Sequence, residues 1–113
     1  NHKYLIAILF AWKRWGEEDK VCDFVNNMVK DDVGLINFIV RSLNKVFTYS
    51  GYTKKTKWEI NLKDIENFVN LSEIEARIRK IYLSSNFKKL NQQKQRALKL
   101  FLDAYNGKSE NMN

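Results

Sequence analysis

Apolar side chains recur at helical spacing along most of the chain. The pattern predicts helices over about residues 3–15, 17–30 and 31–47, and the third carries the richest apolar stripe. The first is unusual because residues 4–12 are apolar on nearly every side, whereas a surface helix normally shows one stripe. We therefore expect this helix to be central to the domain or to pack against another chain. Gly16 follows it, where a left-handed C-terminal cap is favoured.

The helical spacing is interrupted at residues 48–60. Gly51 indicates a turn, and residues 56–60 alternate between polar and apolar side chains with Trp58 and Ile60 on one side. This alternation permits a short hairpin between residues 46–50 and 56–60. An irregular loop is the other possibility.

Helix signals resume after this interruption. Asn61 can cap a short helix, and Ser72 with Glu75 forms a capping box that opens a helix to about residue 83. Asn91 can cap the last helix, which Gly107 is expected to end.

These elements predict an all-α fold, a compact bundle of about six helices with one irregular loop or short hairpin near residues 46–60. The length of 113 residues fits one domain, and the absence of proline permits long helices. Residues 1–107 are expected to form that single helical domain and residues 108–113 a polar tail. Because the chain starts with Asn1 and not with methionine, we expect a fragment of a larger protein.

The side chains that many enzymes need are scarce. Cys22 is the only cysteine and His2 the only histidine, so the usual zinc-binding spacings and Ser–His or Cys–His pairs cannot form within the chain. The four glycines form no phosphate-binding loop. We therefore expect no enzymatic activity in this segment, no catalytic or metal-binding residue and no cofactor.

The lone cysteine indicates a reducing compartment, and we expect a cytoplasmic location. The apolar run of residues 4–12 is too short to span a membrane, which takes about 20 residues.

The net charge of +7 is concentrated in the second half of the chain. Residues 1–47 hold seven basic and six acidic side chains, whereas residues 48–113 hold thirteen and seven. Eight basic and no acidic residues lie between 77 and 99, and three more lysines lie in the aromatic-rich segment near Trp58. The candidate partner-binding residues are Lys54, Lys55, Lys57, Trp58, Arg77, Lys80, Lys88 and Lys89.

Basic groups beside exposed aromatic rings can contact nucleic-acid phosphates and stack on bases. An acidic protein surface or a phospholipid would also suit them, and an ordinary solvated face is the alternative interpretation. If nucleic acid binds to the 77–99 segment, we expect the binding to be weak, salt-sensitive and independent of sequence.

The apolar first helix gives a second candidate surface. Part of it is expected to face an upstream domain, or a second copy of the chain when that domain is absent, because large exposed apolar patches usually mark such contacts. The candidate interface residues are Ile6, Leu9, Phe10 and Trp12.

Four segments between residues 23 and 107 carry a family resemblance. They are 24–38 (FVNNMVKDDVGLINF), 57–63 (KWEINLK), 65–75 (IENFVNLSEIE) and 98–107 (LKLFLDAYNG). Together they resemble the C-terminal helical region of KAP-type P-loop NTPases. The resemblance implies a helical region that follows an ATPase core, in proteins linked to membrane-associated assemblies or to phage exclusion. The nucleotide-binding motifs of that family lie outside this chain, so no nucleotide-binding residue is assigned.

Two functions are therefore expected. The first is a non-catalytic accessory or interaction domain that is C-terminal to a P-loop ATPase core and contacts the upstream domain or a protein partner. The second is a basic, helical nucleic-acid-binding module.

Overall fold

The computed structural model describes the backbone of residues 5–111 and the side chains of residues 5–107. His2, the expected helix start at residue 3 and the end of the polar tail lie outside the described residues. The described elements are α1 (Leu5–Arg14), α2 (Glu18–Met28), α3 (Asp32–Arg41), β1 (Leu43–Ser50), β2 (Thr53–Ile60), α4 (Leu62–Ile65), α5 (Leu71–Tyr82), the 3-10 helix η2 (Ser85–Lys89) and α6 (Gln92–Asn111).

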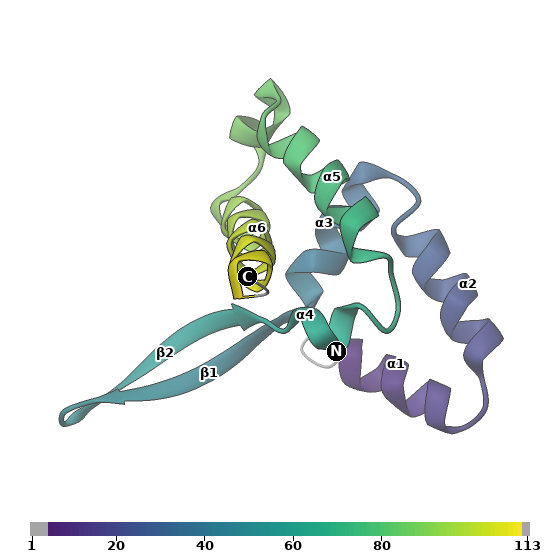
Figure 1. Ribbon diagram of the computed structural model, residues 1–113, viewed down its shortest axis with the longest axis horizontal. Helices are drawn as coiled ribbons and strands as arrows, with labels where there is room; N and C mark the ends of the chain where they lie inside the picture. Colours follow the sequence, from purple (N-terminus) through teal and green to yellow (C-terminus); the bar gives the residue numbers. More distant parts are fainter. Residues whose placement is uncertain (1–4, 112–113) are drawn as a thin grey trace.

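The described chain consists of a helical body and one β-hairpin that projects from it (Figure 1). In the body, α6 packs against α3 and α5, and α1 packs against α2. The hairpin leaves the body between α3 and α4. The mainly helical fold is confirmed, but the expectation of a purely all-α class is wrong because β1 and β2 form a two-stranded antiparallel sheet.

One apolar core holds the body together. Phe38 of α3 and Phe101 of α6 are fully buried, as are Leu9 of α1 and Ile78 of α5. Each of these helices therefore contributes to one shared interior. Burying side chains of this size contributes about 1.5–3 kcal/mol each, so the helices supply most of the core, to which the hairpin adds Leu43.

Four of the predicted helix boundaries are confirmed. Asp31, Asn61 and Asn91 each accept a hydrogen bond from a backbone N–H in the first turn of the following helix, at 2.7–3.1 Å. Gly16 has φ +81° after α1, and the N–H of Glu17 donates to the carbonyl of Trp12 at 3.0 Å. This is the left-handed cap that a glycine permits.

The third helix is shorter than predicted, ending at Arg41 and not at about residue 47. At its end, the Ser42 hydroxyl donates to the carbonyl of Phe38 at 2.8 Å, which turns the side chain back on the helix. The next eight residues, LNKVFTYS, are rich in β-branched and aromatic side chains that favour strands. Leu43 and Phe47 fit helical spacing as well as strand alternation, so spacing alone cannot separate the two.

The hairpin is longer and more tightly turned than predicted. Residues 43–50 pair with residues 53–60, from Leu43 opposite Ile60 to Ser50 opposite Thr53. Only Gly51 and Tyr52 form the loop, and Gly51 has φ +67°. A two-residue turn with glycine first and a positive φ there matches the twist of the flanking strands.

Two further boundaries differ from the sequence prediction. Asn70, and not Ser72, caps α5: its side-chain oxygen accepts from the N–H groups of Ser72 and Glu73 and from the Ser72 hydroxyl. Asn is at least as good a cap as Ser, and using it starts the helix two residues earlier. Gly107 does not end α6, which continues to Asn111. A glycine inside a helix costs only about 1 kcal/mol, and it forces no stop.

Candidate partner-binding site

The β1–β2 hairpin, residues 43–60, is the most exposed part of the described chain and is called the arm below. At its base Leu43 is buried and Ile60 is half-buried. Every side chain from residue 44 to 59 is exposed except half-buried Val46. Only the base therefore packs into the body, and the rest stands in solvent (Figure 1).

Strand alternation sorts the side chains of the arm onto two faces. The register pairs Lys45 with Trp58, Phe47 with Thr56 and Tyr49 with Lys54, and these six residues share one face, called the aromatic face below. The opposite face holds polar side chains, including Lys55 and Lys57. The arm thus separates its rings from most of its neutral polar groups.

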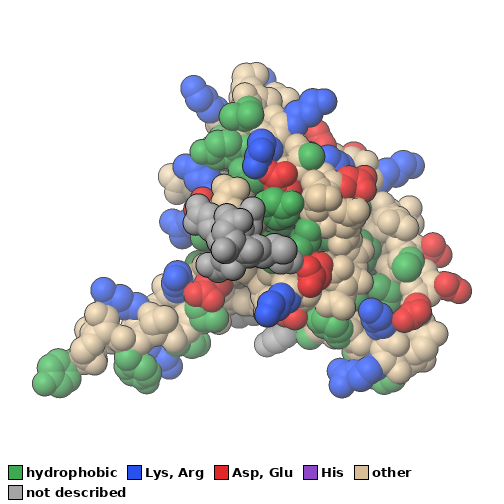
Figure 2. Space-filling view, in the orientation of Figure 1, with side chains coloured by type: hydrophobic (Ala, Val, Ile, Leu, Met, Phe, Trp, Pro, Cys, Tyr) green, Lys and Arg blue, Asp and Glu red, His purple; other side chains and the backbone are tan. Residues whose placement is uncertain are grey.

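The rings of the aromatic face are open to solvent. Phe47 is 53% exposed, Tyr49 75% and Trp58 37%, and Tyr52 is fully exposed at the tip. Green and blue side chains, hydrophobic and basic, gather along the arm in Figure 2. The ammonium of Lys54 lies 4.2 Å from the centroid of the Phe47 ring and that of Lys45 lies 5.5 Å from it. Cations at these distances are attracted to the ring face.

A cleft of about 470 Å³ lies where the arm meets α1. It is lined by Ile6 and Phe10 of α1, by Trp58 and Lys45 of the arm, and by Asp64 of α4 among others. The cleft brings together Ile6 and Phe10 from the predicted interface set and Trp58 from the predicted partner-binding set. It continues the aromatic face onto the body, with charged side chains at its edge.

The remaining members of the predicted interface set lie elsewhere. Leu9 is fully buried in the core, so it offers no surface to another chain. Trp12 packs edge-on against Phe24 of α2 at 5.6 Å between ring centroids, and the ammonium of Lys20 lies 4.7 Å from its ring. On α1 the side chain of Ile8 is exposed instead, because it points away from α2 and the core.

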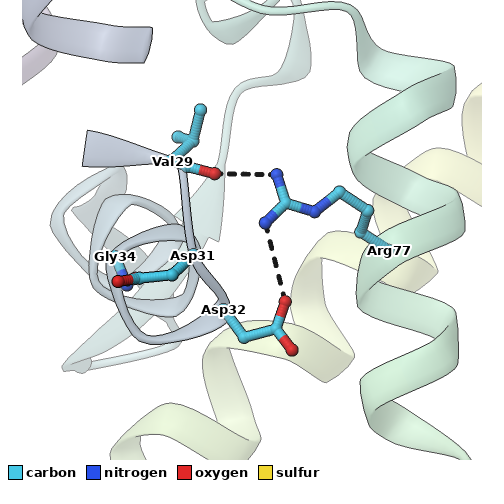
Figure 3. A network of polar contacts seen from close by, with 5 residues as sticks. All are labelled: Val29, Asp31, Asp32, Gly34 and Arg77. Atoms are coloured by element: carbon cyan, nitrogen blue, oxygen red, sulfur yellow. Dashed lines mark hydrogen bonds and ion pairs between the residues drawn. The ribbon is translucent and has the colours of Figure 1, made fainter. Parts of the chain in front are cut away.

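Arg77 joins α5 to the α2–α3 junction (Figure 3). Its guanidinium donates to the carbonyl of Val29 at 2.7 Å and pairs with the carboxylate of Asp32 at 3.5 Å. Val29 follows the last turn of α2, so the arginine satisfies a carbonyl that has no helical partner. Arg77 therefore has a structural role within the fold, and its partner-binding role stays a prediction.

Replacing Arg77 with alanine should lower the free energy of unfolding by about 1.5–3 kcal/mol, the usual contribution of a hydrogen bond from a charged donor. The ion pair adds less than about 1 kcal/mol because Asp32 is largely exposed. Arg77→Lys keeps the charge but cannot make both contacts, and it should recover only part of the loss. Urea denaturation of both variants measures this, and an unchanged midpoint for Arg77→Ala would contradict the structural role.

The other predicted basic residues form no single patch with the arm. Lys80, Lys88 and Lys89 are exposed, but they lie on α5 and η2 at the end of the body away from the arm (Figure 1). Arg79, the residue before Lys80, pairs with Glu75 one turn earlier on α5. The structure thus places Lys54 and Trp58 on one face of the arm and Lys55 and Lys57 on the other, and it leaves the helical lysines apart.

Sequence reasoning left Lys45, Phe47 and Tyr49 out of the candidate set. Their signal is the alternation of residues 43, 45, 47 and 49, which places all of them on one face of a strand. Assigning residues 43–47 to a helix hid that alternation.

Two further properties of the described residues bear on the site. Among the side chains of residues 5–107, no group of three or more histidine, cysteine, aspartate or glutamate residues is arranged to hold a metal ion. In the same part of the chain, no helix combines the length and the apolar character needed to cross a membrane.

Comparison of the chain with protein-family models, with curated proteins and with solved structures found no match.

Proposed function

We propose that this chain is a non-catalytic accessory domain that binds a partner through its arm and follows a P-loop ATPase core. The observation that carries the partner-binding role is the exposure of the arm. A two-stranded hairpin alone in water is at best marginally stable. Exposed rings such as Phe47 and Tyr49 add nothing to the core of this one. A partner that covers them would stabilise the complex by about 25 cal/mol for each Å² of apolar surface buried.

The place beside an ATPase core is supported by the resemblance of residues 24–38, 57–63, 65–75 and 98–107 to the helical region of KAP-type NTPases. The surface that suits contact with that core is the α1 side of the cleft. Ile6 and Phe10 are half-buried there, and the exposed Ile8 lies on the same helix.

A cytoplasmic location is part of the proposal, and it is supported by an exposed cysteine with no second cysteine to pair with.

The reading frame upstream of Asn1 in the gene tests the ATPase part of the proposal. We expect it to encode a Gly-x-x-x-x-Gly-Lys-Ser/Thr loop, whose backbone amides hold the phosphates of a nucleotide. An upstream frame without that loop, or a stop codon directly before Asn1, would refute this part while leaving the role of the arm open.

The partner-binding role of the arm predicts that the body folds without it. The pair Asn44–Glu59 has the same place in the alternating ladder as Ser50–Thr53, which flanks the natural turn. Replacing residues 45–58 with Asn-Gly, a favoured two-residue turn, therefore closes the strands without strain. Because almost all the removed side chains are exposed, we expect a loss of no more than about 1 kcal/mol, or about 4 °C in the melting temperature.

Circular dichroism and thermal unfolding of the shortened chain measure this directly. A shortened chain that loses its helical signal would show that the arm is needed for folding, and the exposure of the arm would then no longer argue for a partner.

A further inference from the structure

We propose that the aromatic face of the arm binds single-stranded nucleic acid, with bases stacked on its rings and phosphates held by its lysines. This inference rests on the proposed function, in which the arm is the partner-binding element, and it names the chemical class of the partner. It also restricts the nucleic-acid site to the arm, whereas the sequence suggested both the lysines near Trp58 and the basic residues 77–99.

The first observation is the arrangement of the rings. Phe47 and Tyr49 lie two residues apart on β1, so their Cβ atoms follow each other at about 6.8 Å along one face. Trp58 lies on the same face towards the body, and Tyr52 extends the series at the tip. Thr56, opposite Phe47, is too small to cover the ring. A row of open rings is the platform on which single-stranded bases stack without regard to sequence.

The second observation is charge. The arm holds four lysines and one glutamate, a net charge of +3. Of these four lysines, only Lys57 is in an ion pair with another described residue, Glu59 at 3.4 Å, whereas Lys45 and Lys54 lie over the Phe47 ring. These two ammonium groups can turn from the ring to a phosphate when a base takes their place. Phosphates beside a stacked base would thus meet cations on the same face.

Other partners fit the arm less well. A second copy would bring two arms of charge +3 together, which is unfavourable. A protein partner would have to bury several lysines, which are depleted in protein interfaces. Duplex DNA could receive a two-stranded ribbon in its major groove, but its bases are already stacked and leave the rings without a partner. A single strand alone uses both the rings and the lysines.

The experiment is a fluorescence anisotropy titration of the whole 113-residue chain at about 150 mM salt. The probes are a labelled 20-nucleotide oligo(dT), a single strand of mixed sequence and a 20-base-pair duplex, with inorganic polyphosphate as a competitor. We expect both single strands to bind at least about 10-fold tighter than the duplex. The log–log salt slope should be about −1.4, since each neutralised phosphate of a single strand contributes about −0.7 and the aromatic face holds two lysines, Lys45 and Lys54.

Matched variants separate stacking from general charge. Phe47→Ala with Tyr49→Ala should weaken single-strand binding by at least about 30-fold. Trp15→Ala removes a ring that is 75% exposed, as Tyr49 is, but lies on the body, and it should change nothing. Lys45→Glu with Lys54→Glu, which changes the two lysines of the aromatic face, should abolish binding. Lys88→Glu with Lys89→Glu changes the net charge equally but far from the arm, and it should weaken binding by less than about 3-fold. Circular dichroism confirms that each variant is folded.

Three results would overturn the inference. One is no binding of either single strand by the unchanged chain. The second is equal affinity for single strand and duplex with no loss in the Phe47, Tyr49 variant, which would mean that charge alone attracts DNA. The third is displacement of the oligonucleotide by polyphosphate at equal phosphate concentration. None of these results affects the test of the upstream reading frame, so the accessory role beside an ATPase core is tested independently of this inference.

Discussion

Replacing Phe101 with alanine should destabilise the protein by about 3–5 kcal/mol. Phe101 is fully buried on α6, the helix that packs against both α3 and α5, so the surrounding helices cannot close the cavity without giving up other contacts. Domains of this size are stable by only about 5–15 kcal/mol in total. The loss should therefore lower the melting temperature by more than about 12 °C, measured by thermal unfolding and checked by urea denaturation.

Phe47→Ala is the matched control because it makes the same chemical change on the arm. Phe47 is 53% exposed and contacts lysine side chains but no core residue, so its loss should change the free energy of unfolding by less than about 0.5 kcal/mol. A large loss in both variants would mean that the arm and the body share one core, and the division between them would be wrong.

The helical body was predictable because each helix carries its own local signal. Asp31, Asn61 and Asn91 are caps whose effect depends on the next three residues only, and Gly16 needs only its own freedom of φ. The cap at Asn70 was missed because Ser72 and Glu75 offer an equally valid capping box two residues later. The choice between two competing local signals is made by packing, since starting at Leu71 buries that side chain.

The arm was only partly predictable, because its strands have no core to give them a one-sided apolar pattern. In residues 43–50 the apolar positions satisfy a period of 3.6 and a period of 2 equally well. The deciding feature is the two-residue turn at Gly51 and Tyr52, which fixes the register of the whole hairpin. Starting from that turn, the six residues of the aromatic face follow directly.

The partner-binding set was predictable in its residue types but not in its grouping. Charge runs in a sequence do not show which basic side chains are already used within the fold. Arg77 is used to bind Val29 and Asp32, which lie more than 40 positions earlier in the chain. No local pattern reports a contact over that separation, and only the packing of α5 beside the α2–α3 junction reveals it.

The same junction explains why Gly34→Ala should be among the most damaging single changes in the chain. Gly34 lies in the first turn of α3. A Cβ at this position would overlap the carbonyl oxygen of Met28 and lie 3.0 Å from its carbonyl carbon and 3.2 Å from Asp31 Oδ1. Two of these three atoms belong to the backbone and the third to the capping carboxylate, so no flexible side chain can move aside.

The chain must then open between α2 and α3. Opening it would disturb the Asp31 cap on the Gly34 N–H, which is 2.7 Å long, and the Val29 carbonyl that Arg77 binds. Overpacking usually costs about 1–3 kcal/mol, and with these linked contacts we expect Gly34→Ala to lower the free energy of unfolding by at least about 3 kcal/mol.

Gly107→Ala is the matched control. Gly107 lies inside α6 with open space around its Cα, so there the same substitution should stabilise the protein by up to about 1 kcal/mol. Urea denaturation of the two variants should therefore give midpoints on opposite sides of the unchanged protein. If Gly34→Ala shifted the midpoint no more than Gly107→Ala does, the close approach of α3 to the end of α2 would be incorrect.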